Sequence, residues 1–346
     1  TASAICGTDL HFVRGTMAGM REGTILGHEG VGVVTETGPG VRNLRPGDRV
    51  VIPSTIGCGS CSYCRAGYFA QCDVANPNGP LAGTAFFGGP EPTGPFDGMQ
   101  AELVRVPFAN VGPVKLPDEV TDDQAIMLSD IFPTAWFGAK LAEVGKGDIV
   151  AVLGCGPVGQ FAVYSALLQG AGRVLAVDGE PSRLDAARRQ GAETIDFNAE
   201  DPVQALRELT GGSGPDRVID AVGVDSKAPQ AGPAADEASD DPSAQALRWA
   251  VDGVAKAGTV GIIGVYPPQF EQFPIGLAMN KNLTLKMGNC NHRRYLPDLV
   301  TMTRAGAVDP SNVLTQVSDV GDAIGAYQAF DREDPGWIKV ALDPRS

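Results

Sequence analysis

One uncharged stretch, residues 149–172, restricts the fold of this chain more than any other feature. It is long enough to span a bilayer as a helix. Three glycines and a proline divide it into a β-branched run and a later run rich in Ala and Leu: Gly154, Gly156, Pro157 and Gly159. This division predicts a buried strand followed by a packed helix, and no membrane span.

The interruption has the spacing G-x-G-x-x-G. Glycines at these positions allow a tight turn, close approach of a pyrophosphate and close packing of the helix on the strand. The amino terminus of the following helix provides a site for an anion. We therefore predict a dinucleotide-binding loop made by Gly154, Gly156, Pro157, Val158 and Gly159. The alternative is a glycine turn with a structural role alone.

Asp178 ends the next predicted strand, about 20 residues after the glycine loop, where dinucleotide-binding folds place an acidic residue. Its carboxylate can accept from both ribose hydroxyls of adenosine and would repel a 2′-phosphate, so the sequence favours NAD over NADP. Arg183 lies nearby in sequence. It is either a phosphate ligand or an exposed helix residue.

The 346 residues are more than one compact core usually holds, which favours two domains. Residues 1–132 have little helical periodicity and predict an irregular β domain, with strands at 32–35, 48–53 and 102–106. Residues 133–288 alternate strands with helices such as 181–190 and 203–210, which predicts an α/β domain with a doubly wound parallel sheet. Its strands are expected at 148–153, 173–178, 193–197, 216–222, 259–265 and 283–287. The tail, residues 289–346, is predicted to return to the first domain.

Four cysteines follow one another with the spacing C-x2-C-x2-C-x7-C: Cys58, Cys61, Cys64 and Cys72. This density suits tetrahedral binding of one ion by four thiolates. A site with four protein ligands has no position for a substrate, so we predict a structural zinc. Disulfides and an iron–sulfur cluster are the alternatives.

Composition limits the partners. The formal charge of −14 and the pI near 4.6 argue against nucleic acid and anionic membrane surfaces. No signal or transit segment is recognisable at Thr1, so we expect a cytoplasmic protein with reduced cysteines.

Two of the three histidines lie in short motifs near the amino terminus: C-G-T-D-x-H ends at His11, and G-H-E contains His28. With the four-cysteine segment and the glycine loop, these motifs resemble those of the zinc-containing medium-chain alcohol dehydrogenases over nearly the whole chain. The resemblance implies a GroES-like catalytic domain beside a Rossmann domain. It also implies a catalytic zinc, a structural zinc, NAD, a small alcohol or aldehyde as substrate, and a homo-oligomer, either tetramer or dimer.

By this resemblance Cys6, His28 and Asp130 are the catalytic zinc ligands. Asp130 stands in place of the cysteine of liver-type enzymes. Glu29 is implied to adjust zinc coordination, and Asp9 to orient His28. An aspartate at this position, with an insertion after Gly223, resembles the glutathione-independent formaldehyde dehydrogenase branch.

The resemblance further implies that Thr8 accepts the proton of the substrate and that His11 delivers it to solvent. Lys339 matches a basic residue near the cofactor pyrophosphate; a solvated strand lysine is the alternative. Cys155 and Cys290 match no ligand position.

Several alternatives remain open from sequence. Polyol or threonine-type zinc dehydrogenases are competing enzymes, and an inactive NAD-binding sensor or scaffold is a competing class. The insertion, residues 225–245, is predicted either to clamp the adenosine half of NAD, as in the formaldehyde dehydrogenase branch, or to be a solvated surface loop. The second interpretation follows from its acidic residues, Asp236, Glu237, Asp240 and Asp241.

Overall fold

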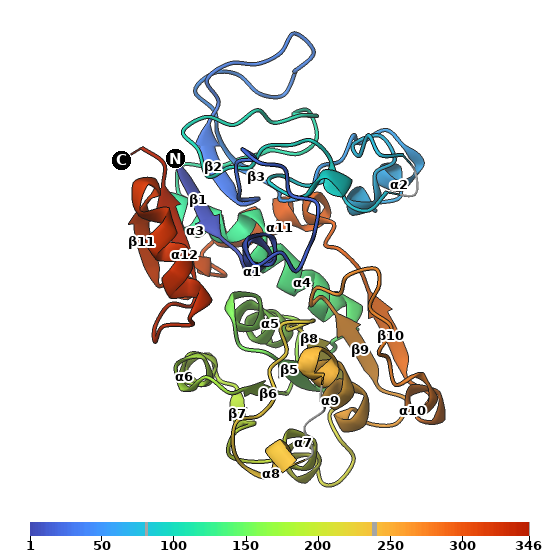
Figure 1. Cartoon of the computed structure of the whole chain (residues 1–346). Coiled ribbons are helices and arrows are strands. Elements are labelled where there is room, and N and C mark those ends of the chain that lie inside the picture. Colours follow the sequence, from blue (N-terminus) through green and yellow to red (C-terminus); the bar gives the residue numbers. More distant parts are fainter. Residues whose placement is uncertain (80–81, 237–240, 346) are drawn as a thin grey trace. The chain divides into compact units, whose positions relative to one another are not determined.

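The computed structural model describes residues 1–79, 82–236 and 241–345. The chain forms two compact units (Figure 1). Unit 1 comprises Thr1–Pro133 and Asn289–Ser346, and unit 2 comprises Thr134–Gly288. The domain boundaries expected from sequence lie within one residue of these limits.

The sheet of unit 1 has the strand order β11-β12-β1-β2-β3-β4. Neighbouring strands are antiparallel except β11 and β12, which are parallel. Because β12 pairs with β1, the C-terminal tail completes the sheet that the amino terminus begins. The strands span Ala2–Ile5 (β1), Gly30–Val33 (β2), Arg49–Ile52 (β3), Val114–Lys115 (β4), Gln316–Asp319 (β11) and Val340–Asp343 (β12).

Unit 1 contains helices that the sequence did not predict. The most important is α1 (Gly7–Val13), which begins directly after Cys6 and carries three predicted site residues. The others are α2 (Ser62–Arg65), α3 (Asp122–Ser129), α11 (His292–Arg304), α12 (Ala323–Asp331) and the 3-10 turns η1 (Phe69–Gln71), η2 (Glu91–Thr93), η4 (Pro310–Val313) and η5 (Val320–Asp322). The predicted strand at 102–106 is wrong: these residues pair with no strand among the described residues, and Leu103 is 74% exposed.

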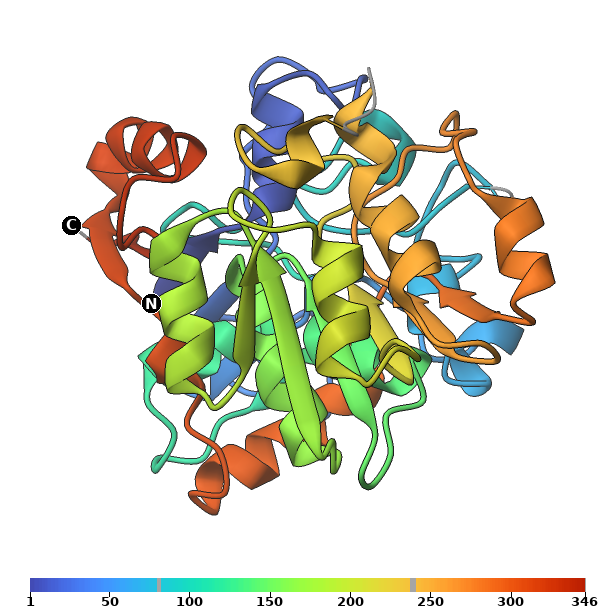
Figure 2. The same ribbon diagram turned by 90° about the horizontal axis from the view of Figure 1, so that it is seen from below.

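Unit 2 is a parallel sheet with the order β10-β9-β8-β5-β6-β7. The chain enters the sheet at β5 in the middle, continues to the edge strand β7, and then returns through β8 and β9 to the opposite edge strand β10. This topology confirms the predicted doubly wound α/β fold. Figure 2 shows its strands side by side and flanked by helices. The strands are Ile149–Leu153 (β5), Arg173–Asp178 (β6), Glu193–Asp196 (β7), Arg217–Asp220 (β8), Thr259–Ile262 (β9) and Thr284–Met287 (β10).

Two pairs of helices in unit 2 contact each other, α5 with α6 and α7 with α9, and α10 also contacts α9. Figure 1 shows the pairs on opposite sides of the strands. The helices span Ile131–Leu141 (α4, which crosses the unit boundary), Pro157–Leu168 (α5), Pro181–Arg189 (α6), Pro202–Leu209 (α7), Pro233–Asp236 (α8), Gln245–Gly253 (α9), Ile275–Asn280 (α10) and the turn Pro242–Ala244 (η3). No helix within the described ranges has the length and apolar character needed to cross a membrane.

Strand β8 ends earlier than predicted. The carboxylate of Asp220, its last residue, accepts hydrogen bonds from the backbone N–H groups of Val222 and Gly223. The hydroxyl of Tyr266 donates to the other oxygen at 2.7 Å. These bonds hold the turn between β8 and the start of the insertion.

The insertion itself is partly described, and its residues Glu237 and Asp240 lie outside the described residues. Before that gap, the N–H of Gln230 donates to the Asn198 side chain at 2.9 Å. Asn198 in turn donates to the carbonyl of Gly179, next to the predicted ribose ligand Asp178. The insertion is therefore attached directly to the segment that follows β7 and, through Asn198, to the loop that follows β6.

Candidate metal and dinucleotide sites

Three predicted metal ligands meet in unit 1. Cys6 follows β1, His28 lies two residues before β2, and Asp130 follows α3. Their ligand atoms all lie within 4.8 Å of one another. Asp130 Oδ2 is 3.2 Å from His28 Nε2 and 3.6 Å from Cys6 Sγ. All three side chains are buried, and the set of one sulfur, one nitrogen and one oxygen suits zinc.

Helix α1 holds Asp9 beside this group. One Asp9 oxygen accepts from the backbone N–H of Cys6 at 3.0 Å, and the other lies 3.1 Å from His28 Nδ1. The predicted orienting position of Asp9 agrees with this geometry, because the contact with Nδ1 leaves Nε2 directed at Asp130.

Burial and neighbouring charges shift the pKa values of all three predicted ligands, His28, Asp130 and Cys6. Burial would lower the pKa of His28, but Asp9, Cys6 and Asp130 outweigh it and raise that pKa well above its usual value. Burial would raise the pKa of Asp130, but hydrogen bonds with His28 and His292 hold it well below its usual value. Burial raises the pKa of the Cys6 thiol. A cation among the three ligand atoms would stabilise the negative charge that burial disfavours.

Glu29 and Lys339 form a fully buried ion pair behind the ligands. Lys339 also donates to the carbonyl of Ile5 at 2.9 Å. The interpretation of Lys339 as a solvated strand lysine is therefore wrong. The predicted position near the cofactor pyrophosphate does not agree with the structure either, because the fully buried ammonium is directed at Glu29 inside unit 1. Burial raises the pKa of Glu29, an effect that Lys339 opposes. Glu29 Oε1 is buried and has no hydrogen-bond partner among the described residues, so this oxygen is available to a cation.

The sequence analysis missed His292. Its ring lies at the start of α11 and is buried, with Nε2 2.6 Å from Asp130 Oδ1 and Nδ1 3.1 Å from Thr55 Oγ1. Burial lowers its pKa, but Cys290 and Asp130 outweigh this and raise the pKa to about 10. It is the third histidine of the chain, and its separation of 162 residues from Asp130 gave no local motif.

Thr8 and His11 lie on α1, three residues apart and therefore on one face of the helix. Thr8 is half-buried, whereas His11 is only 2% exposed. Because His11 is buried, direct delivery of a proton from its ring to bulk solvent does not agree with this structure.

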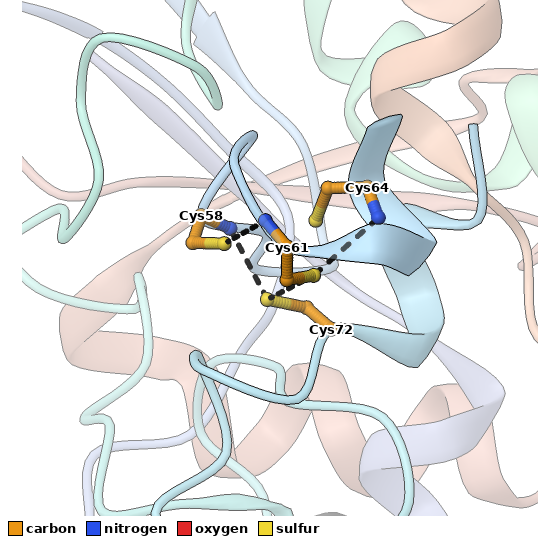
Figure 3. A group of neighbouring side chains, drawn as sticks. All are labelled: Cys58, Cys61, Cys64 and Cys72. Carbon is orange, nitrogen blue, oxygen red and sulfur yellow. Dashed lines mark hydrogen bonds between the residues drawn. The ribbon is translucent and has the colours of Figure 1, made fainter. Parts of the chain in front are cut away.

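The four cysteines form a second cluster, with sulfur atoms within 4.8 Å of one another (Figure 3). Backbone N–H groups donate to the sulfurs: Ser60 and Cys61 to Cys58, Cys64 to Cys61, and Cys58 and Ala75 to Cys72. Burial would raise the pKa of Cys58, but hydrogen bonds from Ser60 and Cys61 lower it to about 6. Burial raises the pKa of Cys64 and of Cys72, so the donors favour a thiolate at Cys58 alone. A cation among the four sulfurs would favour the thiolate form of the others, as in a four-thiolate zinc site.

The glycine loop of unit 2 has the predicted geometry. Gly154 has φ +84°, and a Cβ on Gly159 would lie 1.8 Å from the Gly154 carbonyl oxygen, so the two segments pack without room for a side chain. A Cβ on Gly156 would have no heavy atom within 4 Å. This open space lies at the residue before α5, whose first residues are Pro157 and Val158, and suits a phosphate.

Asp178 ends β6 next to this loop. One carboxylate oxygen accepts from the N–H of Cys155 at 2.6 Å, and the other accepts from Gly179 and Glu180 at 2.8 Å. Three backbone donors thus fix the carboxylate before any ligand binds. Arg183 lies in the first turn of α6 and is half-buried.

Known proteins resemble the chain over its full length. A family model described as alcohol dehydrogenase GroES-like domain matches residues 1–118, and one described as zinc-binding dehydrogenase matches residues 157–304. An uncharacterized zinc-type alcohol dehydrogenase-like protein of Bacillus subtilis is 40% identical over 99% of this chain and 92% of its own length.

A glutathione-independent formaldehyde dehydrogenase of Pseudomonas aeruginosa is 32% identical over 99% of this chain and 88% of its own length. Among solved structures, an alcohol dehydrogenase from Thermus sp. ATN1 has a TM-score of 0.85 and 34% identity, covering 99% of this chain and 90% of that chain.

Proposed function

The chain belongs to the zinc-type medium-chain alcohol dehydrogenase family, and from this we propose that it transfers hydride between a small alcohol or hydrated aldehyde and NAD. The observation that carries the proposal is the convergence of Cys6, His28 and Asp130, which are the three ligand types of an open zinc site.

In this proposal Cys6, His28 and Asp130 hold the catalytic zinc, which supplies Lewis acidity that lowers the pKa of the substrate hydroxyl. Asp9 keeps His28 in the orientation that presents Nε2. The Oε1 atom of Glu29, which has no hydrogen-bond partner among the described residues, is available to the zinc held by these side chains. The Oε2 atom is paired with the ammonium of Lys339. These partners set the charge and rigidity of the site.

Proton transfer falls to α1. The Thr8 hydroxyl takes the proton of the substrate and passes its own proton to His11, one turn further on the same helix face, whose imidazole holds it as imidazolium. The burial of His11 excludes bulk water from direct exchange with its ring.

We assign NAD binding to unit 2. A dinucleotide held there would supply the hydride acceptor. Gly156 leaves space for the pyrophosphate, and Asp178 presents a negative charge that disfavours a 2′-phosphate. We assign Cys58, Cys61, Cys64 and Cys72 to a structural zinc, because all four sulfurs converge and no further ligand is needed.

The finer proposal is formaldehyde as substrate, with NAD retained through turnover. Asp130 and the insertion support it, because the insertion contacts Asn198 beside the Asp178 turn. An insertion attached there can slow the release of adenosine.

A substrate panel tests the activity. Formaldehyde, primary alcohols, aryl alcohols, polyols and threonine are offered with NAD, and NADH absorbance is followed. Protein with two zinc ions per chain and turnover of an alcohol or aldehyde is expected. A chain that binds one zinc and turns over none of these compounds would be a scaffold and not an enzyme.

Bound NAD tests the finer proposal. Protein purified without added cofactor is expected to carry NAD, and Asn198→Ala to release it faster. If the protein is cofactor-free and the substitution leaves the NAD dissociation rate unchanged, the enzyme exchanges NAD in each cycle.

A further inference from the structure

We propose that His292 is a positioning residue for the metal ligand Asp130, and that Asn291 beside it makes the metal affinity of this site depend on the four-cysteine segment. The inference rests on the proposed function, in which Cys6, His28 and Asp130 hold zinc.

The two oxygens of Asp130 have different neighbours. Oδ2 lies near His28 and Cys6, 3.2 Å and 3.6 Å from their ligand atoms. Oδ1 is 2.6 Å from Nε2 of His292, whose N–H donates to this oxygen. A carboxylate held by one oxygen cannot rotate freely, so the imidazole fixes which oxygen faces the metal.

The imidazole is itself held in place. Nδ1 is 3.1 Å from the Thr55 hydroxyl, and that hydroxyl donates weakly to the carbonyl of Cys290 at 3.5 Å. His292 and Thr55 are both buried. The ring is therefore fixed at both nitrogens and transmits the position of the α11 start to Asp130.

The start of α11 is attached to the four-cysteine segment. The side-chain oxygen of Asn291 accepts a hydrogen bond from the N–H of Ala70 at 2.9 Å, and both residues are buried. Ala70 lies in η1, two residues before Cys72. Phe69 of the same turn packs in one apolar cluster with Cys64 and Cys72.

The contacts form a continuous path from Cys72 through Ala70, Asn291 and His292 to Asp130. All of it lies within unit 1. Zinc bound by the four cysteines would hold Ala70 in place. Through Asn291, this would keep the start of α11 in position, and with it the contact between the His292 imidazole and Asp130. Partners of metal ligands typically change metal affinity by about 10–100-fold when they are removed.

Substitutions at His292 test the positioning role. His292→Phe keeps a ring but removes both nitrogens, whereas His292→Gln retains an amide N–H that can reach Asp130. Zinc affinity is measured by competition with a chelator, and the ligand geometry is followed by the visible absorption of cobalt-substituted protein. We expect His292→Phe to weaken the affinity of one of the two zinc sites by about 10–100-fold, and His292→Gln to restore most of it.

Thr303→Val is the matched control, because Thr303 is a buried polar residue in the same helix whose hydroxyl donates to the Leu299 carbonyl within α11. It is expected to leave both zinc affinities and the cobalt spectrum unchanged. If His292→Phe folds, as judged by circular dichroism, and also leaves them unchanged, the positioning role is overturned.

Asn291→Ala tests the connection and keeps His292. We expect it to weaken the same site, by less than His292→Phe does, and Cys72→Ser to weaken that site as well as its own. If Asn291→Ala and Cys72→Ser both leave the zinc affinity of the Cys6, His28 and Asp130 site unchanged, the proposed connection to the four-cysteine segment is refuted. Wild-type protein that binds only one zinc, with no loss in Asp130→Ala, would instead refute the proposed function itself.

Discussion

Lys339 and Glu29 are 310 residues apart in sequence and form an ion pair in which neither side chain is exposed. Lys339 donates in addition to the carbonyl of Ile5, the residue before the proposed ligand Cys6. The pair connects β12 to the segment that carries His28. Its burial means that each charge depends on the other, since an unpaired buried charge is costly.

Lys339→Met is therefore expected to lower the free energy of unfolding by about 3–5 kcal/mol, because it leaves the Glu29 carboxylate buried without a cation. The double variant Lys339→Met, Glu29→Gln should recover part of this loss. Denaturant unfolding of the three proteins measures both effects. A single variant as stable as the wild type would show that Glu29 is neutral or paired elsewhere.

Asp130→Ala is expected to lose the catalytic zinc and to keep the structural zinc, because Cys6 and His28 alone are an incomplete ligand set. Activity should fall by more than about 100-fold, the upper range for loss of a ligand's partner. Asp123→Ala, an exposed aspartate in the first turn of the same helix α3, is the control. Full turnover by an Asp130→Ala protein with one zinc per chain would exclude Asp130 as a ligand.

Asp178→Asn should relax the preference for NAD, because it removes the charge that opposes a 2′-phosphate. Its one amide oxygen can still accept from Gly179 and Glu180, whereas the N–H of Cys155 loses its acceptor. We expect the ratio of kcat/KM for NAD and NADP to fall by about tenfold, which corresponds to about 1.4 kcal/mol. An unchanged ratio would assign cofactor selection to another residue.

Gly159→Ala and Gly156→Ala should differ sharply. The first places a methyl group 1.8 Å from a backbone oxygen, so the loop must shift, and stability should fall by about 1–3 kcal/mol. The second meets no heavy atom within 4 Å, so the melting temperature should stay constant while NAD affinity falls. Thermal unfolding and NAD titration separate the two, and equal NAD affinity in Gly156→Ala and wild type would contradict the pyrophosphate position.

Asp122 gives a pH-dependent contribution to stability. Burial would raise its pKa, but a hydrogen bond from Arg49 at 2.6 Å outweighs this, and the pKa is lowered from 3.8. Because the folded pKa is below the unfolded value, the stabilisation is present above about pH 4 and is lost as the pH falls through the folded pKa. Asp122→Asn should cost about 1 kcal/mol at pH 7, since the pair is partly exposed.

The difference between Asp122→Asn and wild type should shrink as the pH falls below 3.8. Urea unfolding at pH 7 and at pH 3 measures it, with Asp123→Asn as the control that keeps the Arg49 pair. A difference that stays constant between the two pH values would show that the charge of Asp122 is not its source.

The features that could be predicted from sequence are those whose residues lie close together along the chain. The glycine loop and the four cysteines each lie within a short segment, so backbone geometry alone brings their groups together. The alternation of apolar strands and helices likewise determined the parallel sheet of unit 2, because each element buries one face on its neighbours. The predicted strand at 102–106 failed because a β-prone run forms a strand only where a partner is present.

Tertiary structure alone decided which distant side chains complete the site. His292 meets Asp130 across 162 residues, and Lys339 meets Glu29 across 310. The pattern of apolar residues predicts which face of a segment is buried. It does not predict which distant polar residue that segment will contact, because this depends on how the sheet and α11 are placed in the folded protein. Burying an unpaired charge or hydrogen-bond donor costs free energy, so a buried polar group is stable only beside a suitable partner. This cost arises only in the folded protein, where the group is removed from water.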